Sequence, residues 1–171
     1  FNYKDLACTI ILKVFTPKGL LVSHIGDGRA GYLNSKGKWL SSITPHNGEE
    51  SHQTIFITSN AWQKKDFMMS GVLVPESKVI KDEIIAYTLI SDGCEKYCFE
   101  TGNLNKAKNK FIVKNKPFKG FFNPLIEKIR EMLDSKISEG QIKNEFQELL
   151  ENRQGFNSES DDKTMIVGFL N

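Results

Sequence analysis

Three aspartates stand where apolar, strand-like segments of this sequence meet polar turns. Asp27 comes after the segment LLVSHI, Asp92 comes after EIIAYTLI, and Asp161 comes before TMIVGFL. Strands of an antiparallel sheet alternate in direction, so the end of one strand and the start of another share an edge of the sheet. We therefore expect the carboxylates of Asp92 and Asp161 to converge.

Converging carboxylates repel each other unless a positive charge lies between them. A site made only of oxygen ligands suits a hard cation such as Mg²⁺ or Mn²⁺ rather than Zn²⁺. Such an ion activates water and neutralises charge on a phosphoryl group. The alternative is a local role, because an aspartate beside glycine at a strand end commonly accepts backbone hydrogen bonds in a turn. Spacing alone favours that local role for each aspartate.

The first half of the chain contains the strands that must position these aspartates. Runs of apolar and β-branched residues alternate there with turn sequences, and the first four runs predict an antiparallel meander. The expected strands are residues 6–15, 20–25, 29–34, 38–43, 54–58 and 83–90. The last of these is almost wholly apolar and is expected to be buried on both faces. Residues 59–76 have too little periodicity to be assigned.

The second half is predicted to contain two helices and a final strand. Apolar residues recur at three- and four-residue steps from Phe122 to Leu133 and again from Ile142 to Leu150, the pattern of a helix with one buried face. Pro124 lies near the start of the first helix, where its missing N–H costs little. Residues 164–170 form the last expected strand.

Composition excludes several broad classes of function. The 171 residues suffice for one domain with an ordinary core. A formal net charge of +2, with basic residues dispersed among acidic ones, gives no indication of nucleic-acid binding. No apolar run approaches the roughly 18–20 residues that cross a bilayer, so no membrane partner is expected. Because the chain begins with Phe1 rather than Met, we expect it to begin inside a longer or processed protein.

Cysteine and histidine give no indication of a second type of site. The three cysteines lack the spacing of a zinc motif and are expected to be reduced thiols of a cytoplasmic protein: Cys8, Cys94 and Cys98. His24 is expected to lie in a strand. His46 and His52 are expected to be exposed, because they belong to the polar loop of residues 44–53.

Three segments, in this order, resemble motifs of the metal-dependent serine/threonine phosphatases of type 2C. HIGDGRAGYL (24–33) is similar to that family's strand–GDSR–strand motif, with Gly28 in place of the usual serine. LISDGCEKY (89–97) is similar to its apolar strand followed by SDG. SDDKTMIVG (160–168) is similar to its closing D-[DN]-x-[ST] motif. The GDGR variant is closest to the bacterial branch of the family.

The resemblance implies specific roles for the aspartates. Asp92 and Asp161 match ligands of one metal in a binuclear Mg²⁺ or Mn²⁺ pair, and Asp27 matches a position that joins Asp92 at a third, weaker metal site. Asp162 stands where the family often has asparagine and is the less expected ligand. Arg29 is expected to be structural. The implied activity is hydrolysis of phosphorylated protein substrates by a metal-activated water.

The resemblance also implies an α+β fold, a β-sandwich between helical layers (α-β-β-α). Residues 1–171 match the C-terminal part of a single catalytic domain, without the early strands whose Asp-Gly motif supplies the bridging ligand. The sandwich is therefore expected to be incomplete. The chain alone is expected to be nearly inactive and to self-associate through exposed sheet. Two alternatives stay open: a non-catalytic regulatory or binding module with this scaffold, and a structural domain in which the aspartates only close turns.

Overall fold

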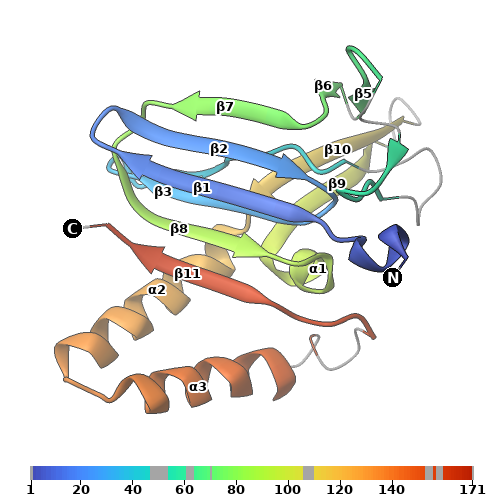
Figure 1. Cartoon of the computed structure of the whole chain (residues 1–171). Helices are drawn as coiled ribbons and strands as arrows, with labels where there is room; N and C mark the ends of the chain where they lie inside the picture. The colour runs from blue at the N-terminus through green and yellow to red at the C-terminus, as the bar shows by residue number, and fades with distance from the viewer. Residues whose placement is uncertain are drawn as a thin grey trace.

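The structure, a computed structural model, describes residues 2–46, 54–60, 64–69, 71–105, 110–152, 156 and 160–170. Two antiparallel sheets are stacked face to face, and two helices pack beneath one of them (Figure 1). The α+β expectation is confirmed, and these two helices form a layer on one side of the sandwich. None of the helices in the described ranges is long and apolar enough to cross a membrane.

The upper sheet in Figure 1 has the strand order β1-β2-β7. Its strands are β1 (Ile10–Thr16), β2 (Gly19–Ile25) and β7 (Glu76–Ile80). β1 and β2 form a hairpin, and β7 pairs with the other edge of β2. The first strand begins later than its apolar sequence predicts, because the segment before it forms a 3-10 turn, Tyr3–Leu6.

The second sheet has the order β11-β8-β3-β4. Its strands are β11 (Met165–Phe169), β8 (Ile84–Ile90), β3 (Arg29–Asn34) and β4 (Trp39–Ser41). β8 lies between β11 and β3, and none of its residues is exposed, as predicted for an apolar strand covered on both faces. The predicted meander is wrong in one respect, because β2 and β3 lie in different sheets.

Each interface of the sandwich has its own apolar core. Leu20 and Val22 of β2 meet Ala30 of β3 between the two sheets. The lower core, between the second sheet and the helices, is larger and rich in aromatic residues; its buried members include Trp39, Ala86, Phe121, Phe122, Leu125, Ile126 and Met165. The two helices are α2 (Lys119–Asp134) and α3 (Glu139–Asn152), which contain both predicted apolar stripes.

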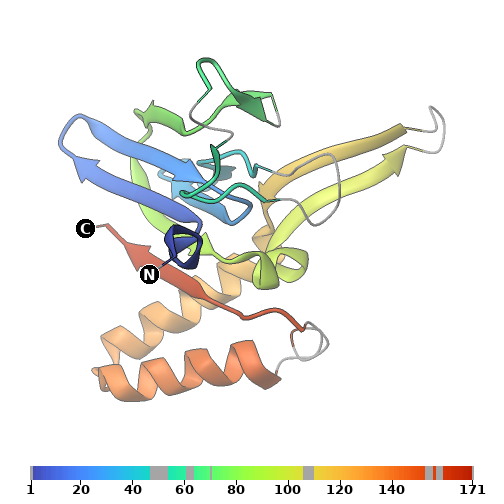
Figure 2. The same ribbon diagram turned by 45° about the vertical axis from the view of Figure 1, so that its right-hand side comes forward.

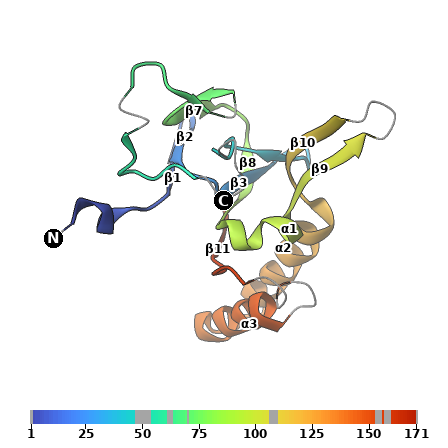
Figure 3. The same ribbon diagram turned by 90° about the vertical axis from the view of Figure 1, so that its right-hand side faces the viewer.

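A long hairpin projects from the body of the molecule (Figures 2 and 3). It consists of β9 (Phe99–Asn105) and β10 (Lys110–Pro117), and it follows the short helix α1 (Glu95–Cys98). Within the unassigned segment, β5 (Met68–Met69) and β6 (Val72–Leu73) pair as a small hairpin. The strand predicted for residues 54–58 is wrong, because only Thr54 makes a bridge and residues 57–58 form a turn.

Candidate metal centre

Asp27 lies in the turn that carries the chain from β2 in one sheet to β3 in the other. The preceding Gly26 has φ +120°, and a Cβ atom there would overlap the side chain of Thr9. Glycine is required at this position because a side chain would be strained in that conformation and would also collide with its neighbour. The tight turn places the half-buried Asp27 at the edge where β3 begins.

Asp92 lies just beyond the end of β8 and opens a 3-10 turn, Asp92–Cys94. Its Oδ1 accepts a hydrogen bond from the Gly93 N–H at 2.9 Å. A Cβ atom on Gly93 would lie 2.5 Å from the carbonyl oxygen of Asp162 and 3.0 Å from that of Asp161. The Asp92 turn and the Asp161 segment are therefore in backbone contact.

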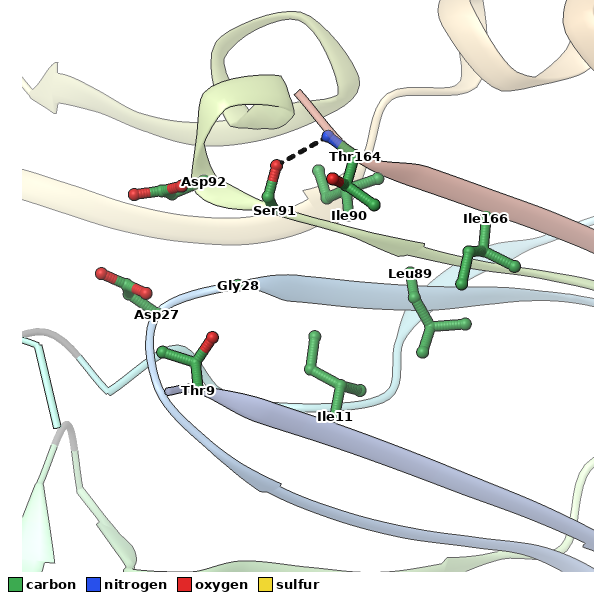
Figure 4. Close-up of a pocket in the computed structure, with 10 residues that line it drawn as sticks. All are labelled: Thr9, Ile11, Asp27, Gly28, Leu89, Ile90, Ser91, Asp92, Thr164 and Ile166. Carbon is green, nitrogen blue, oxygen red and sulfur yellow. Dashed lines mark hydrogen bonds between the residues drawn. The ribbon is translucent and has the colours of Figure 1, made fainter. Parts of the chain in front are cut away.

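Ser91 joins these two segments by hydrogen bonds. Its Oγ donates to the Asp162 carbonyl and accepts from the Thr164 N–H, each at 3.0 Å. The Ser91 N–H also donates to the Thr164 carbonyl at 3.0 Å. The bond between Ser91 Oγ and the Thr164 N–H is drawn in Figure 4. These bonds extend the β8–β11 pairing past its end and hold the Asp161 segment alongside Asp92.

The pKa of Asp92 is affected by the acidic residues near it. Partial burial raises the pKa of the Asp92 carboxyl, the negative charges of Asp27 and Asp161 raise it further, and the bond from the Gly93 N–H opposes them. The charges of Asp27 and Asp161 thus both act on Asp92, although the three carboxylates do not form a group whose ligand atoms all lie within 4.8 Å of one another. A cation among them would remove this repulsion. All-carboxylate ligands fit a hard divalent ion such as Mg²⁺ or Mn²⁺.

A pocket of about 220 Å³ opens beside the carboxylates. Figure 4 shows Asp27 and Asp92 at one end of it and Ile11, Leu89 and Ile166 toward the other. The pocket is therefore acidic at one end and apolar along its length. Such an arrangement can hold a cation at its mouth while apolar walls limit the access of water from one side.

Arg29 ties the start of β3 to the elements around the site. It is buried, donates to Glu95 at 2.6 Å through Nη2 and donates to Asn115 at 2.9 Å through Nη1. Asn115 in turn donates to the Ile43 carbonyl at 2.6 Å. Arg29 thereby connects β3 with α1 and the base of the projecting hairpin, in agreement with the structural role expected of it.

Sequence reasoning missed a second cluster of polar residues beneath the Asp27 turn. His24 lies in β2 as predicted, but the prediction that His46 is exposed is wrong, because its side chain is 0% exposed and stacks on His24 with ring centroids 4.1 Å apart. Glu76, at the start of β7, completes the cluster. A lone histidine in a polar run gives no signal of what packs over it. His52 lies outside the described residues.

Comparison with known families decides how this arrangement is classified. A family model described as protein phosphatase 2C matches residues 1–151. The chain belongs to the protein phosphatase 2C family. The match contains two of the three predicted metal ligands, Asp27 and Asp92, and ends before Asp161. No curated protein and no solved structure matches the chain.

The family match and the geometry both bear on Asp27 and Asp92, and the geometry alone bears on Asp161. A protein phosphatase 2C is metal-dependent, and the aspartates predicted as ligands come from segments that the fold brings to one edge of the second sheet: the β2–β3 turn, the end of β8 and the segment before β11. The carboxylate donors suit the hard cations expected at that edge.

Proposed function

We propose that this chain forms part of a metal-dependent serine/threonine phosphoprotein phosphatase, in which Asp27, Asp92 and Asp161 hold Mg²⁺ or Mn²⁺. One observation carries the proposal: hydrogen bonds of Ser91 and backbone contact at Gly93 hold the Asp161 segment against the Asp92 turn, at the end of the sheet where Asp27 also lies. Repulsion among carboxylates gathered at one end of a sheet is what a divalent cation relieves.

When bound, the ions would lower the pKa of a coordinated water and offset charge on a phosphoryl group. The residues of this chain prepare the site for that chemistry. The Gly93 N–H stabilises the ionised form of Asp92, and Ser91 holds the segment that contains Asp161. Leu89 and Ile166 form part of the apolar wall toward the other end of the pocket.

The substrate class that follows is a phosphorylated protein, and we place the reaction in the cytoplasm, in keeping with three cysteines that form no disulfide. Asp-Gly pairs occur in this chain only at residues 27–28 and 92–93. Both are already assigned, so no Asp-Gly pair is left to bridge two metals. We therefore expect hydrolysis by this chain alone to be very slow, and we propose that it associates through exposed sheet.

Titration with Mn²⁺, followed by electron paramagnetic resonance of the free ion, tests the metal assignment directly. We expect wild-type protein to bind Mn²⁺, and Asp92→Asn and Asp161→Asn each to weaken binding by at least roughly 10-fold. Asp27→Asn should have a smaller effect because it belongs to the weaker site. Asp162→Asn is the matched control, since it removes a neighbouring exposed carboxylate that is not an expected ligand.

Two results would contradict the proposal. Wild-type protein that binds no Mn²⁺ would leave the aspartates as turn residues. Equal affinities in wild type and Asp92→Asn would place the ion elsewhere. In parallel, hydrolysis of an aryl phosphate in the presence of Mn²⁺ tests the expected low activity, and a substantial rate abolished by Asp92→Asn would show that this chain is catalytically sufficient.

A further inference from the structure

Three ionisable side chains meet in the interior beneath the Asp27 turn. His24 comes from β2, His46 from the segment after β4, and Glu76 from the first residue of β7. Their exposed fractions are 2%, 0% and 9%, respectively. One ligand atom from each of the three lies within 4.8 Å of the others. Three separate segments thus place two imidazoles and a carboxylate together in a largely buried position.

Most of the imidazole nitrogens in this cluster lack a hydrogen-bond partner. Both ring nitrogens of His24 and Nε2 of His46 are buried and unpaired. His24 Nδ1 lies 3.2 Å from Oε2 of Glu76, a contact that does not have the geometry of a hydrogen bond. Leaving a buried polar group unpaired costs roughly 1–3 kcal/mol. Such groups usually indicate a water or an ion that completes the site.

The remaining contacts hold Glu76 and His46 in place. Oε2 of Glu76 accepts from the Thr44 N–H at 2.6 Å, and Oε1 accepts from Lys78 Nζ at 2.9 Å. The Gly26 N–H donates to His46 Nδ1 at 3.2 Å, and the His46 N–H donates to the Gly26 carbonyl at 2.8 Å. His24 alone has no side-chain hydrogen bond that restrains its ring.

Burial and neighbouring groups shift the pKa values of His46 and Glu76. Burial and the nearby His24 lower the pKa of His46 to about 4, against the opposing effect of Glu76. Burial would raise the pKa of Glu76, but its contacts with His24, Lys78 and Thr44 lower it to about 2. At neutral pH the cluster therefore offers a neutral imidazole on His46 and an ionised carboxylate, the forms that bind metals.

We propose that His24, His46 and Glu76 bind one transition-metal ion, with Zn²⁺ the best match, at a site separate from the aspartate edge. Two imidazoles and one carboxylate, with a fourth position left for water, are a recurrent zinc ligand set. The three aspartates, in contrast, suit hard cations that prefer oxygen. The chain would thus hold two sites of different chemical preference, and the second does not depend on the proposed phosphatase function.

Ion binding requires a specific rearrangement. The two rings lie 21° from parallel in the stack, so their in-plane nitrogen lone pairs run side by side and cannot both point at one ion. Turning the His24 ring breaks no hydrogen bond, although it alters the 3.2 Å contact with Glu76 and the stack with His46. Coordination through Nε2 of His46 places its proton on Nδ1, so the 3.2 Å bond from the Gly26 N–H is lost. The Gly26 amide therefore reports on occupancy.

Titration with Co²⁺, a spectroscopic substitute for Zn²⁺, tests the site in the full chain. We expect visible d–d absorption of a tetrahedral complex at one equivalent, loss of this absorption when Zn²⁺ is added, and a shift of the Gly26 amide resonance. His24→Leu should fold, because His24 makes no side-chain hydrogen bond, and Glu76→Gln keeps an oxygen for the Thr44 N–H. Both should weaken binding by more than the roughly 10–100-fold that loss of an outer-shell partner costs.

Two control variants separate this site from other sources of binding. His52→Ala removes the third histidine of the chain, and Asp92→Asn removes a carboxylate of the aspartate edge; both should keep the Co²⁺ spectrum. The proposal is overturned if wild type gives no d–d absorption and no stabilisation by Zn²⁺. It is equally overturned if His24→Leu binds like wild type, or if Asp92→Asn abolishes the spectrum.

Discussion

At the scale of single residues, burial makes the fold sensitive to acid through His46. Its pKa is about 4 in the folded protein against an ordinary value of 6.5. The unfolded chain therefore binds more protons between pH 6.5 and pH 4, and stability falls as the pH falls through this window. The slope is at most about 1.4 kcal/mol per pH unit. His46→Asn keeps an acceptor for the Gly26 N–H. This variant should reduce the dependence of the free energy of unfolding on pH, measured by urea denaturation.

Glu76→Gln provides the matched comparison for that measurement. The pKa of Glu76 is lowered from 4.5 to about 2, so its contribution is present above pH 4.5 and is lost as the pH falls toward 2. The variant should flatten this lower window, whereas the fall in stability between pH 6.5 and 4.5 that His46 causes should persist. If His46→Asn retained the wild-type slope in the upper window, the buried imidazole would not be the group responsible.

Arg29 allows a test of a buried charge that the sequence already indicated as structural. Its guanidinium donates to both Glu95 and Asn115, a pair of bonds that the single ammonium of lysine cannot reproduce in the same geometry. We expect Arg29→Lys to lower the free energy of unfolding by about 1–3 kcal/mol, measured by urea denaturation. Lys128→Met, which breaks an exposed pair with Glu145, should cause no measurable loss; a similar loss in both variants would contradict the prediction.

Some residues of the two polar clusters could be placed from the sequence, and others could not. Asp92 and Asp161 could be predicted to approach each other because each adjoins an apolar strand and belongs to a recognisable motif. His46 could not be placed, because its neighbours in sequence are polar and its partners, His24 and Glu76, are 22 and 30 residues away. Burial of a single polar residue is a property of the packed fold, not of a local pattern.

At the scale of elements, the candidate metal centre depends on the close packing of the Asp92 turn against the segment before β11. A Cβ on Gly93 would lie 2.5 Å from the Asp162 carbonyl oxygen, and that backbone cannot move without breaking its bond from Ser91. Gly93→Ala should therefore separate the two segments, lower stability and weaken Mn²⁺ binding. Calorimetric unfolding and Mn²⁺ titration of the same variant measure both effects.

Gly140→Ala is the control for this substitution. Nothing lies within 4 Å of a Cβ at Gly140, which is in the first turn of α3, so alanine there should raise stability by up to about 1 kcal/mol through helix propensity. Mn²⁺ binding should be unchanged. If Gly93→Ala behaved in the same way, the two segments would not need to be in contact for metal binding.

Elements with a strong period were predicted well, and those without one were not. The apolar stripes of α2 and α3 and the apolar run of β8 follow directly from spacing. The hairpin of β9 and β10 was missed, because its strands are rich in Lys and Asn rather than in alternating apolar residues. The crossing from β2 to β3 was also missed, since a glycine-rich turn does not reveal which sheet the next strand joins.

At the scale of the whole molecule, the outer face of the β1-β2-β7 sheet is unusually apolar. Val14, Leu21 and Val79 form one row across its three strands, because Val14 pairs with Leu21 and Leu21 with Val79. These side chains are 43%, 44% and 54% exposed, and Leu12 beside them is 54% exposed. A contiguous exposed apolar patch next to β1, which is an edge strand among the described residues, indicates a surface that favours association.

We therefore expect the chain to self-associate as its concentration rises, with this face at the interface. Leu21→Lys places a charge at the centre of the row, and burying that charge in an interface would cost free energy. The variant should therefore sediment as a monomer at concentrations where the wild-type protein does not. Leu133→Lys, at a 51% exposed position on α2, changes charge and apolar area equally but on the helical side, and it should sediment like wild type. A wild-type protein that stays monomeric at every concentration, or a Leu133→Lys variant that dissociates instead, would exclude this sheet as the interface.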